Sequence, residues 1–336
     1  TKNVPVIGPS KAGAVLEGSK EFAKGFMQRH HIPTAGYKSV TAANLEEGLA
    51  FLETLEAPYV LKADGLCAGK GVLILPTLEE AKKELKEMLG GMFGNASATV
   101  VIEKFLSGIE CSVFVLTDGK NYKILPEAKD YKRIGEGDKG LNTGGMGTVS
   151  PNPYYTDEIA KECMDTIFLP TIAAMNQEGR PFKGCLYFGL MLTPNGPRVI
   201  EYNCRFGDPE TQVVLPRLKS DLLEIMIAVR NECLSDVDIE WSDEAAACVV
   251  MASGGYPEKY EKGIEMTGLN ENGQIEGATV YHAGTKKENG KFYTNGGRVL
   301  GVTATDTTLE GALKKAYNAV SKIHFEGAHY RTDIGK

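Results

Sequence analysis

The stretch Val199-Ile200-Glu201-Tyr202-Asn203-Cys204-Arg205-Phe206-Gly207-Asp208-Pro209-Glu210-Thr211-Gln212 contains the features from which the architecture of this chain can be inferred. Side chains alternate between the two faces of a strand, which places Ile200, Tyr202, Cys204 and Phe206 on one face and Glu201, Asn203 and Arg205 on the other. Glu201 and Asn203 then offer neighbouring oxygen ligands that suit a hard cation such as Mg2+ bound to phosphates, and Arg205 adds a forked donor for an anion. Gly207 is expected to end the strand, and Asp208, Pro209 and Glu210 are predicted to be the N-cap, first residue and first-turn acid of a helix. A metal site and a helix N-terminus are therefore expected within one short turn of each other.

An edge strand with a solvated polar face would show the same alternation without forming any site. Such a strand does not call for Cys204 and Phe206 on its other face, followed directly by a capped helix. The site interpretation is therefore favoured.

Composition limits the kind of protein this can be. The chain has 336 residues, of which 42% are hydrophobic and 24% charged, so two or three ordinary globular domains are expected. A net charge of -7 argues against a nucleic-acid-binding surface but not against a small phosphorylated ligand. Seven scattered cysteines without a C-x-x-C pair indicate a reducing cytoplasm, and no apolar run has the length of a membrane span or the form of a signal segment.

A glycine-rich loop joins two predicted strands, residues 59–63 and 72–75. The loop contains Gly65, Gly69, Lys70 and Gly71, and its spacing fits neither the Walker A pattern nor G-x-G-x-x-G. Its bare backbone N–H groups could fold over phosphates, although a flexible hairpin turn would be about as common for the loop alone. Lys62 favours the phosphate interpretation, because a lysine within an apolar strand is costly unless it faces an anion.

Two further connections are candidates for ligand contacts. Residues 102–108 link two predicted strands, and Phe105 and Leu106 could flank an adenine edge, with Glu103 taking the exocyclic amine and Glu110 a ribose hydroxyl; an interdomain hinge is the simpler interpretation.

Residues 129–147 are predicted to form a long loop, and structureless loops of this size are usually functional or disordered. Its glycine-rich end, residues 142–147, favours close approach of the backbone to a ligand.

Several elements are predicted from periodicity and turn residues. Residues 4–10 are expected to form a buried strand, residues 11–29 two helices interrupted near Gly18 and Ser19, and residues 156–174 one amphipathic helix. Residues 184–192 and 198–206 are predicted to form an antiparallel hairpin. Residues 295–297 are predicted to be a hairpin turn. Arg298 and His282 could line a cleft, but a turn-flanking Arg298 and a core His282 are the favoured interpretations.

Taken together, these features resemble the ATP-grasp ligases: Lys24 on a helix, Lys62 with its glycine loop, residues 103–106 as a hinge, and Glu201 and Asn203 as metal ligands. Within that superfamily, residues 62–71, 142–147 and 203–212 are close to the signature of the phosphoribosylamine–glycine ligase family. The likeness runs from Val6 to Gly335. It implies an α+β protein with the ATP-grasp fold, in which two α+β lobes sandwich ATP, followed by a small C-terminal α/β domain.

The resemblance implies a reaction of de novo purine biosynthesis. ATP phosphorylates the carboxylate of glycine, the amine of 5-phosphoribosylamine attacks the acyl phosphate, and ADP, phosphate and glycinamide ribonucleotide are released. The implied ATP-binding residues are Lys24, Lys62, Gly65, Gly69, Lys70, Gly71, Glu103, Phe105, Leu106 and Glu110. Glu201 and Asn203 would bind Mg2+, with Mn2+ as a substitute. The implied acceptor side consists of Asp130, Asn142, Thr143, Gly144, Gly145, Arg205, Asp208 and Glu210, of which Arg205 and Asp208 are the catalytic candidates.

Family members begin with a Rossmann-like domain, and residues 1–22 match only its last strand and following helix. Residues 23–40 and 110–237 are then expected to form the large ATP-grasp lobe, residues 41–109 the small mobile lobe, and residues 238–336 the C-terminal domain. Because Thr1 is not a methionine, we expect the chain to begin inside a larger protein whose missing domain packs on the acceptor site.

Two other functions remain open at this level. The chain could be another ATP-grasp carboxylate–amine ligase or a carboxylase, although residues 142–147 and 205–212 speak against this. It could also be a nucleotide-binding module that lacks catalysis.

Overall fold

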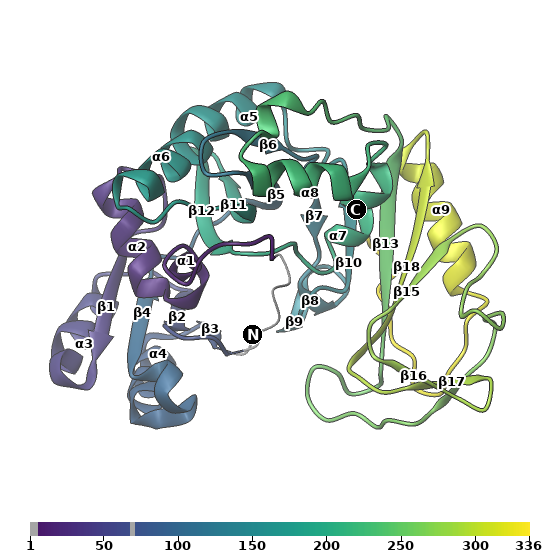
Figure 1. Ribbon diagram of the computed structural model, residues 1–336. Helices are drawn as coiled ribbons and strands as arrows, with labels where there is room; N and C mark the ends of the chain where they lie inside the picture. Colours follow the sequence, from purple (N-terminus) through teal and green to yellow (C-terminus); the bar gives the residue numbers. More distant parts are fainter. Residues whose placement is uncertain (1–5, 68–70) are drawn as a thin grey trace. The chain divides into compact units, whose positions relative to one another are not determined.

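The computed structural model describes residues 6–67 and 71–336 (Figure 1). The chain divides into two compact units, which are described separately below. Unit 1 contains Thr1–Ile124, Thr156–Arg205 and Met226–Val237; unit 2 contains Leu125–Tyr155, Phe206–Ile225 and Asp238–Lys336. Among the described residues, no helix is both long and apolar enough to cross a membrane.

The first sheet of unit 1 has four antiparallel strands in the order β1-β4-β2-β3. These strands are β1 (Tyr37–Thr41), β4 (Thr99–Glu103), β2 (Tyr59–Ala63) and β3 (Val72–Leu75). Two helices, α3 (Leu45–Glu53) and α4 (Leu78–Glu87), pack with it around a core that includes Leu52, Leu61 and Leu85. The Thr77 hydroxyl caps α4 by accepting a hydrogen bond from the backbone N–H of Glu80. The strands predicted at residues 59–63 and 72–75 are confirmed.

The second sheet of unit 1 has the order β12-β11-β5-β6. Its strands are β5 (Ile109–Thr117), β6 (Tyr122–Ile124), β11 (Gly184–Thr193) and β12 (Gly196–Asn203), and its helices include α5 (Asp157–Cys163) and α6 (Leu169–Gln177). The predicted β11–β12 hairpin is confirmed. The single helix predicted at residues 156–174 is instead α5 and α6 joined by a π-helical turn, Met164–Phe168. Phe188 packs edge-on against both Phe168 and Tyr202 in the core of this sheet.

Two short helices lead into unit 1. They are α1 (Val15–Gly18) and α2 (Lys20–Arg29), so the interruption predicted near Gly18 and Ser19 is confirmed. Ser19 caps α2 through a hydrogen bond from the N–H of Phe22. The strand predicted at residues 4–10 is wrong over residues 6–10, where there is no strand and Val6 is 84% exposed. Residues 4 and 5 of that prediction lie outside the described residues.

Unit 2 is built on a five-stranded sheet in the order β15-β18-β13-β10-β7, on which α9 (Leu309–Val320) lies along β13 and β18 (Figure 1). The strands are β7 (Lys129–Asp130), β10 (Gly147–Ser150), β13 (Ala245–Ala252), β15 (Thr279–His282) and β18 (Arg298–Asp306). A three-stranded sheet contains β14 (Glu265–Met266), β16 (Thr285–Glu288) and β17 (Lys291–Thr294). The remaining helices are α7 (Thr211–Val214) and α8 (Leu222–Asn231), of which α8 is shared between the two units.

Three expectations for unit 2 are wrong. Residues 129–147 are not a structureless loop, because they contain β7 and a two-stranded hairpin of β8 (Arg133–Gly135) and β9 (Lys139–Asn142). Residues 295–297 are not a hairpin turn, since β17 pairs with β14 and β16, whereas β18 belongs to the five-stranded sheet. His282 is exposed rather than in the core, and its ring bonds to Thr285 and to the Gly273 carbonyl.

Replacing Phe188 by alanine should destabilise the protein strongly. The side chain is fully buried between two other aromatic rings, so the substitution is expected to cost about 3–5 kcal/mol in free energy of unfolding. Leu223→Ala is the control, because Leu223 is 65% exposed and the change should stay within about 0.5 kcal/mol. Urea denaturation measures both values, and equal effects would contradict the assignment of Phe188 to the core.

Candidate functional site

A buried group of three charges lies where α2 meets the first sheet of unit 1. The carboxylate of Glu103 is 2.9 Å from the amine of Lys24 and 3.0 Å from the amine of Lys62. All three side chains are less than a tenth exposed. Register explains part of this arrangement, because β2 and β4 pair Val60 with Glu103, and Lys62, two residues after Val60, lies on the same face of the sheet as Glu103. The anion that Lys62 faces in this structure is therefore Glu103.

Two amines share one carboxylate here, so the group carries one net positive charge. Burial, together with repulsion from Lys62, lowers the pKa of Lys24 to about 8, although Glu103 opposes the shift. Burial disfavours the charged form of Glu103, but Lys62 and Lys24 nevertheless hold its pKa below the usual value. An uncompensated positive charge in a buried place is favourable to an anionic ligand.

Hydrogen bonds join this charged group to β12 of the second sheet. The amine of Lys24 donates to the hydroxyl of Thr34 at 2.8 Å, and Thr34 donates to the Val199 carbonyl at 2.7 Å. The amine of Lys62 lies 3.4 Å from the carbonyl of Ile200, the residue before Glu201. The predicted phosphate-binding lysines and the predicted metal-binding strand are therefore neighbours within one unit.

Glu201 and Asn203 lie on one face of β12. In the β11–β12 register they are paired with Gly189 and Tyr187, whereas Tyr202 between them is buried on the opposite face. Gly189 leaves room beside Glu201, since a Cβ atom there would lie 3.1 Å from the Glu201 side chain. The predicted alternation fails at Ile200, where a bulge shifts the register, and beyond Asn203, where the strand ends.

The described residues contain no group of three His, Cys, Asp or Glu side chains that could hold a metal. Glu201 and Asn203 instead supply two oxygen ligands next to lysines. This donor set fits Mg2+, which is usually bound by one or two protein oxygens while phosphates and waters complete its octahedron.

Lys20 and Asp64 belong to this site and were not predicted. The Asp64 carboxylate accepts hydrogen bonds from the Ser19 hydroxyl at 2.9 Å and from the Glu21 N–H at 2.8 Å, at the start of α2. The amine of Lys20 donates to the Gly65 carbonyl at 3.2 Å. Burial lowers the pKa of Lys20; Glu201 opposes this shift and Lys62 adds to it. An acid just before a glycine loop and a lysine in a first helical turn were the available sequence signals.

The start and end of the glycine loop are well packed. The N–H of Gly65 donates to Ala96, and the Gly71 carbonyl accepts from Ala63. A Cβ atom at Gly71 would lie 2.8 Å from Cys67, so only glycine fits there. Gly69 and Lys70 were also predicted to contact ATP, and they lie outside the described residues.

The remaining predicted ATP contacts flank β4 and β5. Phe105 is 37% exposed and Leu106 is partly buried in the connection between these strands. The β5–β11 register pairs Glu110 with Met191 and Ser112 with Gly189. Because paired residues of an antiparallel sheet share a face, Glu110 lies on the same face as Glu201.

In unit 2, Arg298, which was not assigned to the site, joins two of the predicted acceptor residues, Gly144 and Asp208. Its guanidinium lies 2.9 Å from the carboxylate of Asp208 and donates to the Gly144 carbonyl at 2.5 Å. The Tyr256 hydroxyl accepts from the N–H of Gly144 at 3.1 Å. A turn-flanking role was favoured for Arg298 over one in a cleft, because its position in the sequence gave no signal that it would reach residues 154 and 90 positions away.

Close packing inside the protein explains the glycines of this loop. A Cβ atom at Gly144 would lie 2.9 Å from the Arg298 guanidinium. At Gly145, where φ is +112°, a Cβ atom would lie 2.4 Å from Pro209 and 2.6 Å from Asp130. Thr143 holds the loop start through hydrogen bonds with the Lys132 carbonyl. The glycines thus permit contacts among Asp130, residues 142–145 and residues 208–209.

The prediction that Asp208 caps a helix is wrong. The helix α7 begins at Thr211, and the Asp208 carboxylate bonds to Gln212 and Arg298 instead. Glu210 is buried just before α7. Arg205, in unit 1, is exposed and lies 3.5 Å from Glu17.

Cys204 lies between Asn203 and Arg205, just after the end of β12, and is partly buried. Burial raises its pKa to about 12, so it remains a thiol at neutral pH. The seven cysteines are thiols rather than disulfides.

Family comparisons agree with the geometry. The family "Phosphoribosylglycinamide synthetase, ATP-grasp (A) domain" matches residues 18–211, and "Phosphoribosylglycinamide synthetase, C domain" matches residues 246–336.

Similar curated proteins carry consistent names. The chain is 47% identical to "Phosphoribosylamine--glycine ligase" of Vibrio vulnificus over 99% of this chain and 77% of that protein. It is 49% identical to "Bifunctional purine biosynthetic protein PUR2,5" of Pichia angusta over 98% of this chain and 42% of that protein.

Solved structures show the same fold. Phosphoribosylamine–glycine ligase from Thermotoga maritima superposes with a TM-score of 0.84 at 39% identity, covering 99% of this chain and 82% of that one. A biotin carboxylase domain from Hydrogenobacter thermophilus, solved with MgADP and bicarbonate, gives a TM-score of 0.73 over 98% of this chain and 71% of that one. At 16% identity, this second likeness shows the fold alone.

The shared carboxylate predicts an asymmetry between two substitutions. Glu103→Gln leaves two buried amines without a counter-charge and should cost about 3–5 kcal/mol in free energy of unfolding. Lys62→Met leaves a neutral Lys24–Glu103 pair, so it should cost less than half as much while raising the dissociation constant for ATP. Urea denaturation and nucleotide titration measure these effects, and the assignment fails if Lys62→Met leaves ATP binding unchanged.

Proposed function

This chain belongs to the phosphoribosylglycinamide synthetase family, the phosphoribosylamine–glycine ligases, and we propose how its own residues carry out the ATP-dependent ligation of glycine to 5-phosphoribosylamine. The protein is an ATP-grasp ligase of purine biosynthesis. The observation that carries the residue-level proposal is the buried group of Lys24, Lys62 and Glu103, with its surplus positive charge next to the Glu201 face of β12.

ATP is proposed to bind within unit 1. Its phosphates would compensate the positive charge of Lys24 and Lys62 and would accept hydrogen bonds from backbone N–H groups of the glycine loop that begins at Gly65 and ends at Gly71. The contacts predicted for Gly69 and Lys70 stay part of this proposal. Phe105 and Leu106 would flank the adenine, and Glu110 would accept from a ribose hydroxyl. Glu103 was predicted to take the exocyclic amine of adenine. Because its carboxylate is engaged with both lysines, we propose instead that it holds their amines in place.

Glu201 and Asn203 are the residues that would hold Mg2+, or Mn2+ in its place. The bound cation supplies charge neutralisation on the phosphates, which favours phosphoryl transfer. Glu201 and Asn203 can keep their oxygens fixed because β12 is hydrogen-bonded to β11 along its length.

The reaction is proposed to proceed in two steps, phosphoryl transfer and then acyl transfer. A carboxylate oxygen of glycine attacks the γ-phosphorus of ATP, so the bond to ADP breaks and glycyl phosphate forms. The amine of 5-phosphoribosylamine then attacks the acyl carbon, phosphate leaves and a proton is released. Positioning and charge, rather than a covalent nucleophile, are what this chemistry needs from the protein.

The acceptor side is assigned to the loop with its supporting residues. Asp130, Asn142, Thr143, Gly144, Gly145 and Glu210 are proposed to bind substrate, with Arg205 and Asp208 also acting near the reacting atoms. Support comes from the hydrogen bonds and close contacts that gather residues 130, 144–145 and 208–209 in unit 2.

The predicted lobes stay part of this proposal: residues 23–40 with 110–237, residues 41–109, and residues 238–336. So do a cytoplasmic location and the packing of a Rossmann-like N-terminal domain on the acceptor site. A carboxylase is less well supported, because the likeness to the biotin carboxylase domain is one of fold only.

Turnover measurements test the function. ADP release should require both glycine and 5-phosphoribosylamine generated in place, in this chain or in a form extended by the N-terminal region of its relatives. Glu201→Gln should fold normally but lose at least about tenfold in kcat/KM for Mg-ATP, because one cation ligand loses its charge. Glycine-independent ADP release, or none from the extended form, would overturn the ligase assignment; an unfolded Glu201→Gln variant would indicate a structural role instead.

ATP affinity should also depend on pH. The pKa of Lys24 lies near 8, so below that value the amine is charged and above it the surplus positive charge disappears. Affinity for a nonhydrolysable ATP analogue at constant free Mg2+ is therefore expected to fall as the pH rises from about 7 to about 9.5. Calorimetric titration measures this, and Lys24→Met should bind more weakly with a flatter pH profile; a profile that Lys24→Met leaves unchanged would rule out Lys24 as the titrating group.

A further inference from the structure

The C-terminal residues 329–336, named here the C-terminal strap, are fixed to the core of unit 2. His329 exchanges two backbone hydrogen bonds with Ala252 at the end of β13, at 2.7 and 2.9 Å. The Tyr317 hydroxyl, on α9, donates to the Arg331 carbonyl and accepts from the N–H of Ile334. Ile334 itself is buried in a cluster with Tyr131. The strap is therefore held by hydrogen bonds to β13 and α9 and by the burial of Ile334.

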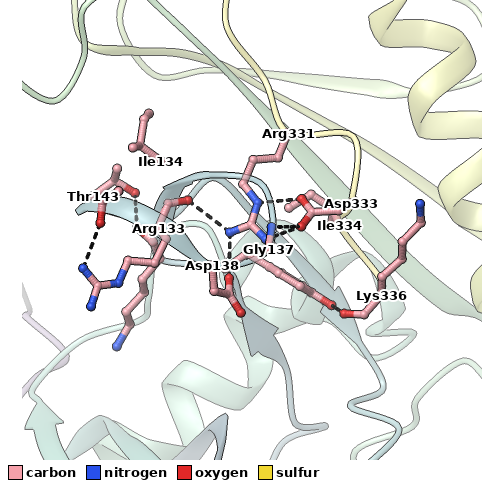
Figure 2. Close-up of polar contacts among 12 residues, drawn as sticks. Arg133, Ile134, Gly137, Asp138, Thr143, Arg331, Asp333, Ile334 and Lys336 are labelled. Carbon is pink, nitrogen blue, oxygen red and sulfur yellow. Dashed lines mark hydrogen bonds and ion pairs between the residues drawn. The ribbon is translucent and has the colours of Figure 1, made fainter.

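Arg331 connects the strap to the β8–β9 hairpin. Its side chain is 1% exposed and binds the Asp333 carboxylate through two nitrogens, at 2.7 and 2.8 Å. Its third nitrogen donates to Asp138 at 2.8 Å and to the Arg133 carbonyl at 3.1 Å. Figure 2 shows this guanidinium reaching from the strap to Asp138 and to the carbonyl of Arg133. Its plane also lies over the ring of Tyr131, 5.2 Å from the centroid.

The strap contacts the hairpin at three further places. The His329 ring bonds to the Ile134 carbonyl at 2.8 Å. The N–H and hydroxyl of Thr332 donate to Glu136, and Asp333 accepts from the N–H of Gly137 at 2.7 Å. Almost every residue of the first strand and the turn is therefore held by residues 329–333.

The hairpin has little else in its own structure to stabilise it. It has only two strands, and residues 136–141 are exposed. Two-stranded hairpins are marginally stable in water, so bonds from outside are needed to keep one ordered. Its last residue, Asn142, pairs with Arg133 and leads directly into Thr143, Gly144 and Gly145.

We propose that the C-terminal strap, acting through Arg331, positions the β8–β9 hairpin and thereby orders residues 142–145 for acceptor binding. The ordering of residues 142–145 for acceptor binding rests on the proposed function, whereas the positioning of the β8–β9 hairpin does not. Arg331 contacts none of residues 142–145 in its own bonds, so it is a positioning residue rather than a catalytic one.

Two variants separate positioning from folding. Arg331→Met removes all four side-chain bonds of the arginine. Asp138→Asn removes one charge from an exposed turn, and asparagine tolerates the positive φ of 54° at this position. Lys315→Met is the control for the exposed Asp138 change, since it breaks an exposed ion pair in the same unit whose partners, Asp306 and Thr305, belong to β18 rather than to the hairpin.

Hydrogen exchange followed by mass spectrometry tests whether Arg331 positions the hairpin. In the full chain, Arg331→Met should speed exchange in peptides covering residues 133–145 by about tenfold or more, and Asp138→Asn should do so by a few fold. Peptides covering β13 and β18, and the Lys315→Met protein, should be unchanged. Unchanged exchange in the hairpin, or an equal increase throughout unit 2, would overturn the positioning role.

Steady-state kinetics tests whether the hairpin orders residues 142–145 for acceptor binding. Asp138→Asn should raise KM for 5-phosphoribosylamine several fold while leaving KM for ATP unchanged, because ATP is assigned to unit 1. If exchange increases while KM for the amine stays constant, the link to acceptor binding is overturned. If the unmodified protein shows no glycine-dependent turnover, the proposed function and this link fail together, whereas the exchange result still decides the positioning of the hairpin.

Discussion

One buried carboxylate, that of Glu103, connects the parts on which the nucleotide side of this protein depends. It holds Lys24 from a helix and Lys62 from a neighbouring strand, and both lysines bond onward toward β12, one through Thr34 and the other at Ile200. Burying two amines against one carboxylate is unfavourable by itself, because the desolvation of the extra charge is not repaid. A bound polyanion, such as the phosphates of ATP, would compensate the extra positive charge. The same surplus charge would then lower the stability of the free protein and raise its affinity for an anionic ligand.

The predicted ATP residues and the predicted acceptor residues differ in how they are built. The first group is carried by regular strands and a helix. Pairing of β2 with β4 places Lys62 and Glu103 on one face of the first sheet, and the bond from Lys62 to the Ile200 carbonyl joins them to the strand that carries Glu201. The second group lies on loops and a two-stranded hairpin, and it depends on side chains from the C-terminal third of the chain. Arg298 and Tyr256 bond to Gly144, while Arg331 holds the hairpin that precedes it. The region that follows the ATP-grasp domain therefore supports the residues that are proposed to bind the acceptor.

Errors in the sequence interpretation had specific physical causes. Residues 129–147 have too many charges and glycines to show strand periodicity, yet the bonds from Arg331, Thr332 and Asp333 compensate for that weakness. The turn residues at 295–297 do change the chain direction, but the strands on either side enter different sheets. Asp208 has the chemistry of an N-cap, and a partner distant in sequence, Arg298, takes its carboxylate instead. In each case a long-range contact outweighed a local preference.

The sequence by itself determined the elements and faces that follow from period and burial: the strands at 59–63 and 72–75, the β11–β12 hairpin, and the shared face of Glu201 and Asn203. It also determined the family, because long motifs of unusual residues are rarely matched by chance. Only the tertiary structure decided which charges meet. Glu103 between its two lysines, Asp64 at the start of α2, and Arg298 and Arg331 beside the hairpin and its loop are contacts between residues far apart in the chain. Side-chain pairing at such separations has no local signature, since it depends on how sheets and helices are packed rather than on the residues that flank each position.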